Sequence, residues 1–220
     1  MKLFDWDFAL AILPDLLRAS LNTLYITAVG FAIALVLGLL LAIARRSRLA
    51  VFSWPATGLI EFIRSTPLLI QVYFLFYVFP NYGISLTALQ AGIIGIALHY
   101  ACYTAEVYRA GLDAVPRGQW EAVTALNMKP LTAYRDVILP QALRPVLPAL
   151  GNYLVAMLKD TPVLSAITVV ELMQQAKNIG SESFRYLEPI TLVGLFFLAV
   201  SLILAWFVRR LEARMEHAPR

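Results

Sequence analysis

The sequence predicts an all-α integral membrane protein, a single transmembrane domain over residues 1–220 with five transmembrane helices. Of its residues, 60% are hydrophobic and only 15% are charged, whereas about 25% is typical of soluble domains. Several long stretches lack Asp, Glu, Lys and Arg, and a helix needs roughly 20 apolar residues to cross ~30 Å of hydrocarbon. One charged segment with several prolines, about residues 113–140, separates these stretches and is expected to form a structured polar loop.

The lengths of the uncharged stretches indicate where each of the five spans lies in the chain. The first span is expected in the 26 uncharged residues 19–44, after a short interfacial helix at 8–17. Two spans share the 41 uncharged residues 65–105, because Pro80–Gly83 is typical of a tight turn. The last two spans are expected at about 136–158 and in the 20 uncharged residues 189–208.

Basic residues collect beside alternate span ends. Arg45, Arg46 and Arg48 follow the first span, and Arg209 and Arg210 follow the last. Lys and Arg favour the cytoplasmic side of a membrane, so both of these ends are expected there. Five spans then put the N-terminus outside and the C-terminus and the polar loop in the cytoplasm. Because topology accounts for the net charge of +4, no nucleic-acid partner is expected.

The polar loop carries a spaced motif. Glu121-Ala122-Val123, then Asn127, then Val137-Ile138-Leu139-Pro140 follows the pattern Glu-Ala-Ala, three residues, Gly, nine residues, Ile, one residue, Leu-Pro. Asn127 stands where the pattern has glycine, and asparagine is among the few other residues that readily adopt a positive φ. A helix, a turn and a second short helix opened by Pro130 are therefore expected. An apolar face for a partner's groove is expected from Trp120, Ala122, Ala125, Leu126 and Met128.

This motif resembles the coupling loop of the permease subunits of binding-protein-dependent ATP-binding-cassette (ABC) importers. Four further segments resemble the polar amino acid branch of that family: Arg64–Gln71, Tyr103–Leu112, Gly118–Ala122 and Lys159–Pro162. Within the branch, Tyr100–Asn127 and Asp160–Glu188 are most similar to a permease subunit for ectoine and hydroxyectoine, which are compact zwitterions.

The resemblance implies the partners. It implies docking of the loop on cytoplasmic ATPase subunits through Gly118, Glu121, Ala122, Ala125, Asn127, Leu139 and Pro140. It also implies a second permease subunit, the same or a similar chain, an extracytoplasmic solute-binding protein, and a place in the bacterial plasma (inner) membrane. ATP and Mg²⁺ would be bound by the ATPase, because this chain has no Gly-x-x-x-x-Gly-Lys-Ser/Thr phosphate loop. No cofactor of its own is expected.

A possible substrate path is indicated by charges that interrupt an apolar run. Lys159, Asp160 and Thr161 precede Pro162 in the otherwise apolar stretch that ends at Val170. Charged residues at membrane depth are costly and usually face a cavity, and broken helices offer backbone ends to a charged ligand. Asp160 is expected to accept an ammonium or amidinium group. The alternative is that Lys159 and Asp160 mark the outer end of the fourth span.

Other polar residues in the spans have two interpretations each. Gln71 either lines the path or bonds across helices. Glu106 contacts substrate or pairs with Arg109, three positions later on the same helix face. Arg64 is a topology determinant or part of an inner gate, and His99 is expected to be a hydrogen-bonded packing residue.

Enzyme chemistry is not expected. The sequence has no His-Glu-x-x-His motif, no Gly-x-Ser-x-Gly elbow and no cluster of metal ligands. His99, Cys102 and Glu106 are close in sequence, yet nothing beside them supplies an oxyanion hole. The main alternative to an importer subunit is a channel or secondary transporter that works without an ATPase, which would have no use for an exposed apolar docking face.

Overall fold

The computed structural model describes the backbone of residues 4–216 and the side chains of residues 4–213; the ends of the predicted domain, 1–3 and 217–220, lie outside the described residues. Within this part the chain contains helices and no strand. In chain order the elements are α1 (Trp6–Arg45), α2 (Ala50–Arg64), α3 (Leu68–Tyr73), η1 (Phe74–Val78), η2 (Phe79–Tyr82), α4 (Ala88–Asp113), α5 (Arg117–Ala125), α6 (Pro130–Ala133), η3 (Tyr134–Ile138), α7 (Leu139–Asp160), η4 (Thr161–Ile167), α8 (Leu172–Ser183) and α9 (Leu187–Glu216).

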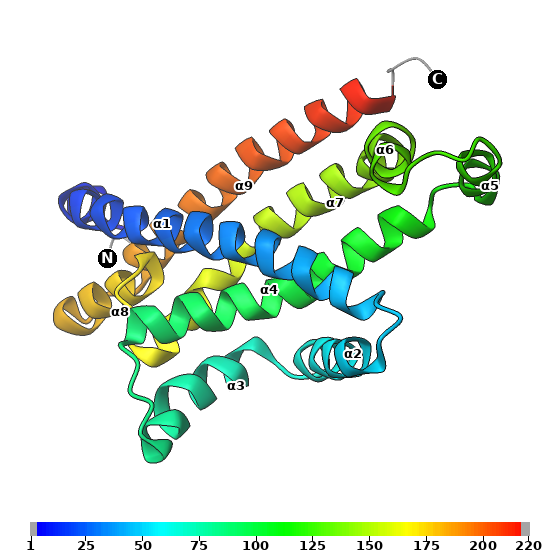
Figure 1. Cartoon of the computed structure of the whole chain (residues 1–220). Coiled ribbons are helices and arrows are strands. Elements are labelled where there is room, and N and C mark those ends of the chain that lie inside the picture. The colour runs from blue at the N-terminus through cyan, green and yellow to red at the C-terminus, as the bar shows by residue number, and fades with distance from the viewer. Residues whose placement is uncertain (1–3, 217–220) are drawn as a thin grey trace.

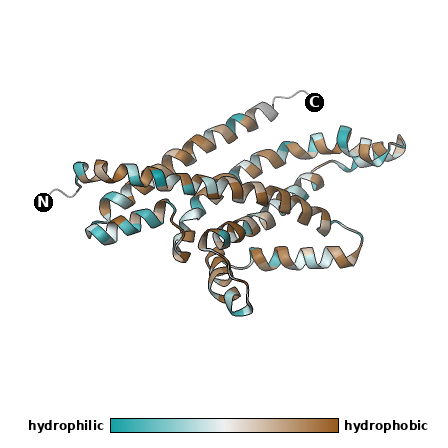
Figure 2. Ribbon diagram, turned by 60° about the vertical axis from the view of Figure 1, so that its left-hand side comes forward, coloured by the Kyte–Doolittle hydropathy of each residue, from teal (hydrophilic) through white to brown (hydrophobic). Residues whose placement is uncertain are grey.

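Four long helices, α1, α4, α7 and α9, pack in an elongated bundle (Figure 1). Helices α1 and α4 approach closely because Gly38 faces Thr104 and the backbone of Ala101; a Cβ at Gly38 would lie 2.0 Å from Thr104 Oγ1. The Thr104 hydroxyl donates across this contact to Ala34 O at 3.0 Å. Apolar side chains of α1, α2, α3, α4, α7 and η4 fill the main core. Figure 2 shows hydrophobic residues along the long helices and hydrophilic residues mainly near the bundle ends.

Helix α1 is continuous from Trp6 to Arg45, so the prediction of a separate interfacial helix at 8–17 is wrong. Its buried residues continue at a spacing of three or four from Ala9 to Ala42, across the polar positions where a break was expected. One uninterrupted buried stripe favours one helix. Its 40 residues make it about 60 Å long, so it extends beyond ~30 Å of hydrocarbon.

By length and hydropathy, three described helices are able to cross a membrane: α1, α4 and residues 187–213 of α9. Two bent pairs raise the number to five if each pair forms one span. The first pair joins Ala50–Arg64 to Leu68–Tyr82 at 107°, and the second joins Pro130–Ile167 to Leu172–Ser183 at 47°. The five predicted spans correspond to this upper count, and the sides on which the termini lie stay a prediction.

Helix α2 was not predicted, and it changes how the second span begins. It ends at Arg64, and the chain then bends at Pro67, the residue before α3. Proline cannot donate a backbone hydrogen bond and disfavours helix in the residue before it, which explains a corner at this point. The predicted tight turn at Pro80–Gly83 is confirmed: a 3₁₀ helix ends there, with Gly83 left-handed at φ 81°.

One ionic cluster stabilises the end of the bundle at which the N-terminus lies. The Asp5 carboxylate caps α1 by accepting from the amides of Asp7 and Phe8, and Arg185 donates to its second oxygen at 3.2 Å. Arg185 also binds Glu188 and lies over the Phe8 ring. The Phe8 amide, followed by the Arg185 guanidinium, lowers the pKa of Asp5. The cluster thus ties the start of α1 to the α8–α9 corner.

Candidate functional site

The polar loop folds as a helix-turn-helix. Helix α5 ends after Ala125, Asn127 is left-handed at φ 49°, and the Met128 amide donates back to Val123 O at 3.0 Å. Pro130 opens α6 at its first turn, where its missing amide hydrogen costs no helical bond. The expected positive φ at Asn127 and the expected proline start are both confirmed. The π-helical turn η3 then leads directly into α7.

Some apolar residues of this helix-turn-helix pack against the bundle, and others are exposed. Trp120 and Met128 are half-buried, and the Trp120 ring packs edge-on against Tyr134 with centroids 5.6 Å apart. Val123 is buried, and the cluster of Val115, Ile138 and Ala142 anchors the segment to the ends of α4 and α7. By contrast, Leu126 and Leu131 are 74% and 81% exposed. The other predicted loop residues are also exposed: Gly118, Glu121, Ala122, Ala125, Asn127, Leu139 and Pro140.

Asp160 lies where α7 gives way to the 3₁₀ helix η4. The Tyr100 hydroxyl, on α4, donates to Asp160 Oδ2 at 2.6 Å, a charge-assisted bond in a half-buried setting. The break itself is embedded in the main core, because Leu164 and Ile167 of η4 are fully buried there. Asp160 therefore borders the interior of the bundle, on the side of α7 that faces α4.

The two neighbours of Asp160 behave differently. Lys159 is exposed and, within the described residues, makes no ion pair or side-chain hydrogen bond. Thr161 is fully buried, and its hydroxyl donates to Leu158 O at 2.8 Å. The hydroxyl hydrogen is therefore already used by a neighbouring residue in the chain. Of the three predicted path residues at the break, only Asp160 has its side chain bonded to another helix.

A group of aromatic rings surrounds the Tyr100–Asp160 contact, and sequence reasoning did not single it out. Tyr103 and Tyr153 lie 5.6 Å apart by ring centroids, and Tyr153 lies 6.2 Å from Tyr100. Arg64 Cζ lies 5.4 Å from the centre of the Tyr103 ring. Such rings offer a cation both π faces and hydroxyl acceptors. The only sequence signal was the Tyr100, Tyr103 spacing, which puts both rings on one face of α4.

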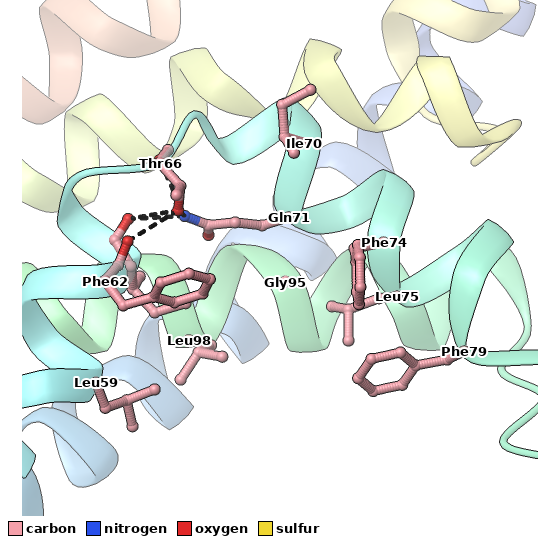
Figure 3. Close-up of a pocket in the computed structure, with 11 residues that line it drawn as sticks. Leu59, Phe62, Thr66, Ile70, Gln71, Phe74, Leu75, Phe79, Gly95 and Leu98 are labelled. Carbon is pink, nitrogen blue, oxygen red and sulfur yellow. Dashed lines mark hydrogen bonds between the residues drawn. The ribbon is translucent and has the colours of Figure 1, made fainter. Parts of the chain in front are cut away.

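Gln71 bonds across the corner between α2 and α3. Its amide nitrogen donates to Ile63 O at 2.8 Å, Thr66 O at 3.0 Å and Thr66 Oγ1 at 2.9 Å. Its carbonyl oxygen lies 3.1 Å from His99 Nδ1 on α4, so His99 is hydrogen-bonded as expected. Figure 3 shows the amide directed at Thr66, on the wall of an otherwise apolar cavity of about 320 Å³. These bonds favour the interpretation of Gln71 as a structural link.

Glu106 joins three helices at the other end of α4. It accepts from Arg109 at 3.0 Å, as the three-residue spacing predicts, and from Arg45 of α1. Arg64, at the end of α2, has its NH1 3.9 Å from Glu106 Oε2. Individual ion pairs of this exposure contribute only about 0–1 kcal/mol, but one carboxylate facing three arginines fixes the relative positions of the helix ends.

Two of the predicted path residues, Asp160 and Glu106, are joined by one line of contacts. It runs from Asp160 through Tyr100 and Tyr103 to Arg64 and Glu106. Gln71 joins it at the side through His99, whose ring lies 5.1 Å from that of Tyr103. Lys159 and Thr161 are not on it. Within residues 4–213, no three His, Cys, Asp or Glu side chains lie close enough to hold a metal ion.

Residues 34–217 match the family of binding-protein-dependent transport system inner membrane components. The chain belongs to this family. It is therefore an ABC transporter permease, a multi-pass protein of the inner membrane, and its relatives are transporter subunits rather than enzymes.

Individual relatives cover almost the whole permease. It is 44% identical to a probable amino-acid ABC transporter permease protein (y4tG) of Sinorhizobium fredii, over 96% of this chain and 95% of the relative. It is 35% identical to the glutamine transport system permease protein GlnP of Escherichia coli, over 97% and 98%. A crystal structure of an amino acid ABC transporter with histidines superposes with a TM-score of 0.92 at 33% identity, over 96% of this permease and 99% of that chain.

Proposed function

We propose that this permease is the membrane subunit of an ATP-driven importer that carries a small polar solute into the cytoplasm. The solute we propose is an amino acid or a compact zwitterion such as ectoine or hydroxyectoine. The names of the relatives from S. fredii and E. coli support an amino acid-like solute. The ammonium group of an amino acid, or the amidinium group of an ectoine-like zwitterion, suits the acceptor Asp160 and the tyrosine rings near it.

The observation that carries the proposal is the exposed apolar face of α5 and α6. Leu126 and Leu131 are almost fully exposed at the end of the bundle where the arginine-rich span ends collect. Large apolar side chains exposed on an otherwise polar segment favour a protein contact. We infer that an ATPase subunit, which would bind ATP and Mg²⁺, receives this face, with Ala122 and Ala125 allowing close approach.

The segment is suited to transmit motion. It is joined without a loop to α7 through η3, and its apolar cluster packs against the end of α4. These are the two helices that hold Asp160 and Tyr100. A rigid-body displacement of α5–η3 on closure of the ATPase pair would therefore tilt α7 against α4 and alter the Tyr100–Asp160 contact. A second permease subunit, the same or a similar chain, would complete the path, and an extracytoplasmic solute-binding protein would deliver the solute.

The docking role is tested by Ala122→Glu. This change puts a charge into the proposed interface, and we expect uptake to be lost and co-purification of the ATPase to fall, with insertion in the membrane unchanged. Thr124→Glu is the matched control, because it adds the same charge to an exposed position two residues away, on another face of α5. Normal uptake by Ala122→Glu would favour the alternative, an ATPase-independent channel or secondary transporter.

The solute-binding role is tested by Asp160→Asn. A hydrogen bond to a charged group is worth about 1.5–3 kcal/mol, and tenfold in affinity corresponds to about 1.4 kcal/mol. We therefore expect the KM of uptake to rise at least about tenfold. Lys159→Gln, at the exposed neighbour, should change the KM less than twofold. Equal uptake kinetics in both variants would mean that Asp160 does not contact the solute.

A further inference from the structure

A second cavity, of about 630 Å³, lies at the end of α1 and takes no part in the proposed solute path. Its apolar wall includes Leu39 and Ile43 from α1 and Leu112 from α4. Its polar wall includes Arg46 and Arg48 from the residues after α1, and Tyr134 from η3. The cavity therefore has an apolar part and a basic part. It lies between the first span and the coupling segment, which comprises α5, α6 and η3 (residues 117–138).

The cavity lies at the end of the first candidate span. Arg46 and Arg48 directly follow the most apolar part of α1. Two residues later α2 begins, and its first turns expose Val51, Phe52 and Trp54, the last of these at 78%. Exposed apolar and aromatic side chains of this kind on a helix beside basic residues are typical of contact with the membrane interface.

Among residues 4–213, the positive charges of Arg46 and Arg48 are not fully neutralised. Arg46 donates to Asp113 Oδ1 at 2.6 Å, but the other oxygen of Asp113 already accepts from Arg109 at 2.8 Å. Arg48 is exposed, and no residue from 4 to 213 forms an ion pair or side-chain hydrogen bond with it. The basic part of the cavity thus carries a net positive charge within the described residues, which favours an anionic partner.

We propose that this cavity binds an anionic phospholipid. Its phosphate and headgroup bind Arg48 and Arg46, and the first part of an acyl chain contacts Leu39, Ile43 and Leu112. A soluble anion would leave the apolar wall unused, whereas a phospholipid fits both parts of the cavity. Because Tyr134 belongs to the coupling segment, the bound lipid bridges that segment and the end of α1.

The test measures lipid binding directly. The full-length chain is purified from its native membrane with the subunits that accompany it, and transferred to mild detergent with equal amounts of phosphatidylglycerol and phosphatidylcholine. Retained lipid is counted by native mass spectrometry. We expect retention of phosphatidylglycerol over phosphatidylcholine, and about fivefold weaker retention in Arg48→Gln, since one arginine near an anionic surface contributes about 1 kcal/mol.

Arg209→Gln is the matched control, because Arg209 is also an exposed arginine at the end of a span but does not line the cavity. It should retain as much phosphatidylglycerol as the unaltered chain. Equal loss in both variants, or equal retention of the two lipids, would overturn the proposal. So would displacement of the lipid by excess inorganic phosphate, which would indicate a simple anion site. Loss of an accompanying subunit from Arg48→Gln, with lipid unchanged, would make the cavity a protein interface. None of these readouts depends on transport.

Discussion

Substitution of Gly38 by alanine tests the close contact of α1 and α4 on which the bundle depends. The added Cβ would lie 2.0 Å from Thr104 Oγ1 and 2.8 Å from the backbone oxygen of Ala101. The hydroxyl can rotate away, but it then loses its bond to Ala34 O in a fully buried site. The backbone oxygen cannot move without separating the helices. Both effects oppose folding.

The loss of stability expected for Gly38→Ala is the sum of three contributions. Overpacking costs about 2 kcal/mol, the lost hydrogen bond costs about 1 kcal/mol, and replacing glycine by alanine within a helix returns about 1 kcal/mol. The net loss of stability is about 2 kcal/mol. For a chain of this size, 1 kcal/mol shifts the Tm by roughly 2–4 °C, so we expect a decrease of roughly 4–8 °C.

The assay is thermal unfolding of the purified permease in mild detergent, with Gly58→Ala as the control. Gly58 is also inside a helix, but a Cβ there meets no atom within 4 Å, so this variant should be slightly more stable than the original chain. Thr104→Ala should restore part of the stability of Gly38→Ala, because it removes the hydroxyl that the new Cβ meets. If Gly38→Ala and Gly58→Ala unfold at the same temperature, the helices are not in the contact described.

Two further predictions concern the coupling segment and the N-terminal cluster. Asn127→Gly should leave the unfolding temperature nearly unchanged, whereas Asn127→Val should destabilise the segment by about 1–2 kcal/mol, because a β-branched residue disfavours φ 49°. Amide hydrogen exchange across α5 and α6 measures this difference. Equal exchange in both variants would contradict the prediction. Asp5 has a folded pKa below its unfolded value of about 4, so its stabilising effect is complete above that value and is lost as pH falls through the folded pKa. The Tm of Asp5→Asn should therefore lie below that of the original chain at pH 7, and the difference should shrink as pH falls below about 4, through the folded pKa. A difference that stays constant would show that the carboxylate charge is not the cause.

Local signals in the sequence were sufficient for much of the fold. Charge-free lengths located the long helices, Gly83 marked the tight turn, and the spaced motif predicted the left-handed Asn127 and the start of α6 at Pro130. These features depend on a few neighbouring residues. Helix α2 was missed because Pro55, Gly58 and Glu61 interrupt its apolar pattern, although Ile60 and Ile63 still face the core.

The candidate path was harder to predict because its residues meet only in the folded bundle. Tyr100 and Asp160 are 60 positions apart, and each alone is compatible with simple packing. The same is true of Arg64 and Glu106, which come from different helices. Conversely, Trp120 was expected on the free docking face. In the structure it packs on Tyr134 of η3, which lies beside α5. Periodicity describes one helix and carries no information on which helices lie together.

The π-helical turn η3 has a consequence for how this region tolerates changes in length. An α-helix turns by roughly 100° per residue, so deleting one residue from the middle of α7 rotates everything beyond it to a different face. A π turn already contains one residue more than the α-helical path requires. Loss of one residue between Tyr134 and Ile138 would convert η3 to an ordinary turn and keep the phase between α6 and α7. A one-residue deletion introduced at this turn should therefore be tolerated better than one in the helices on either side.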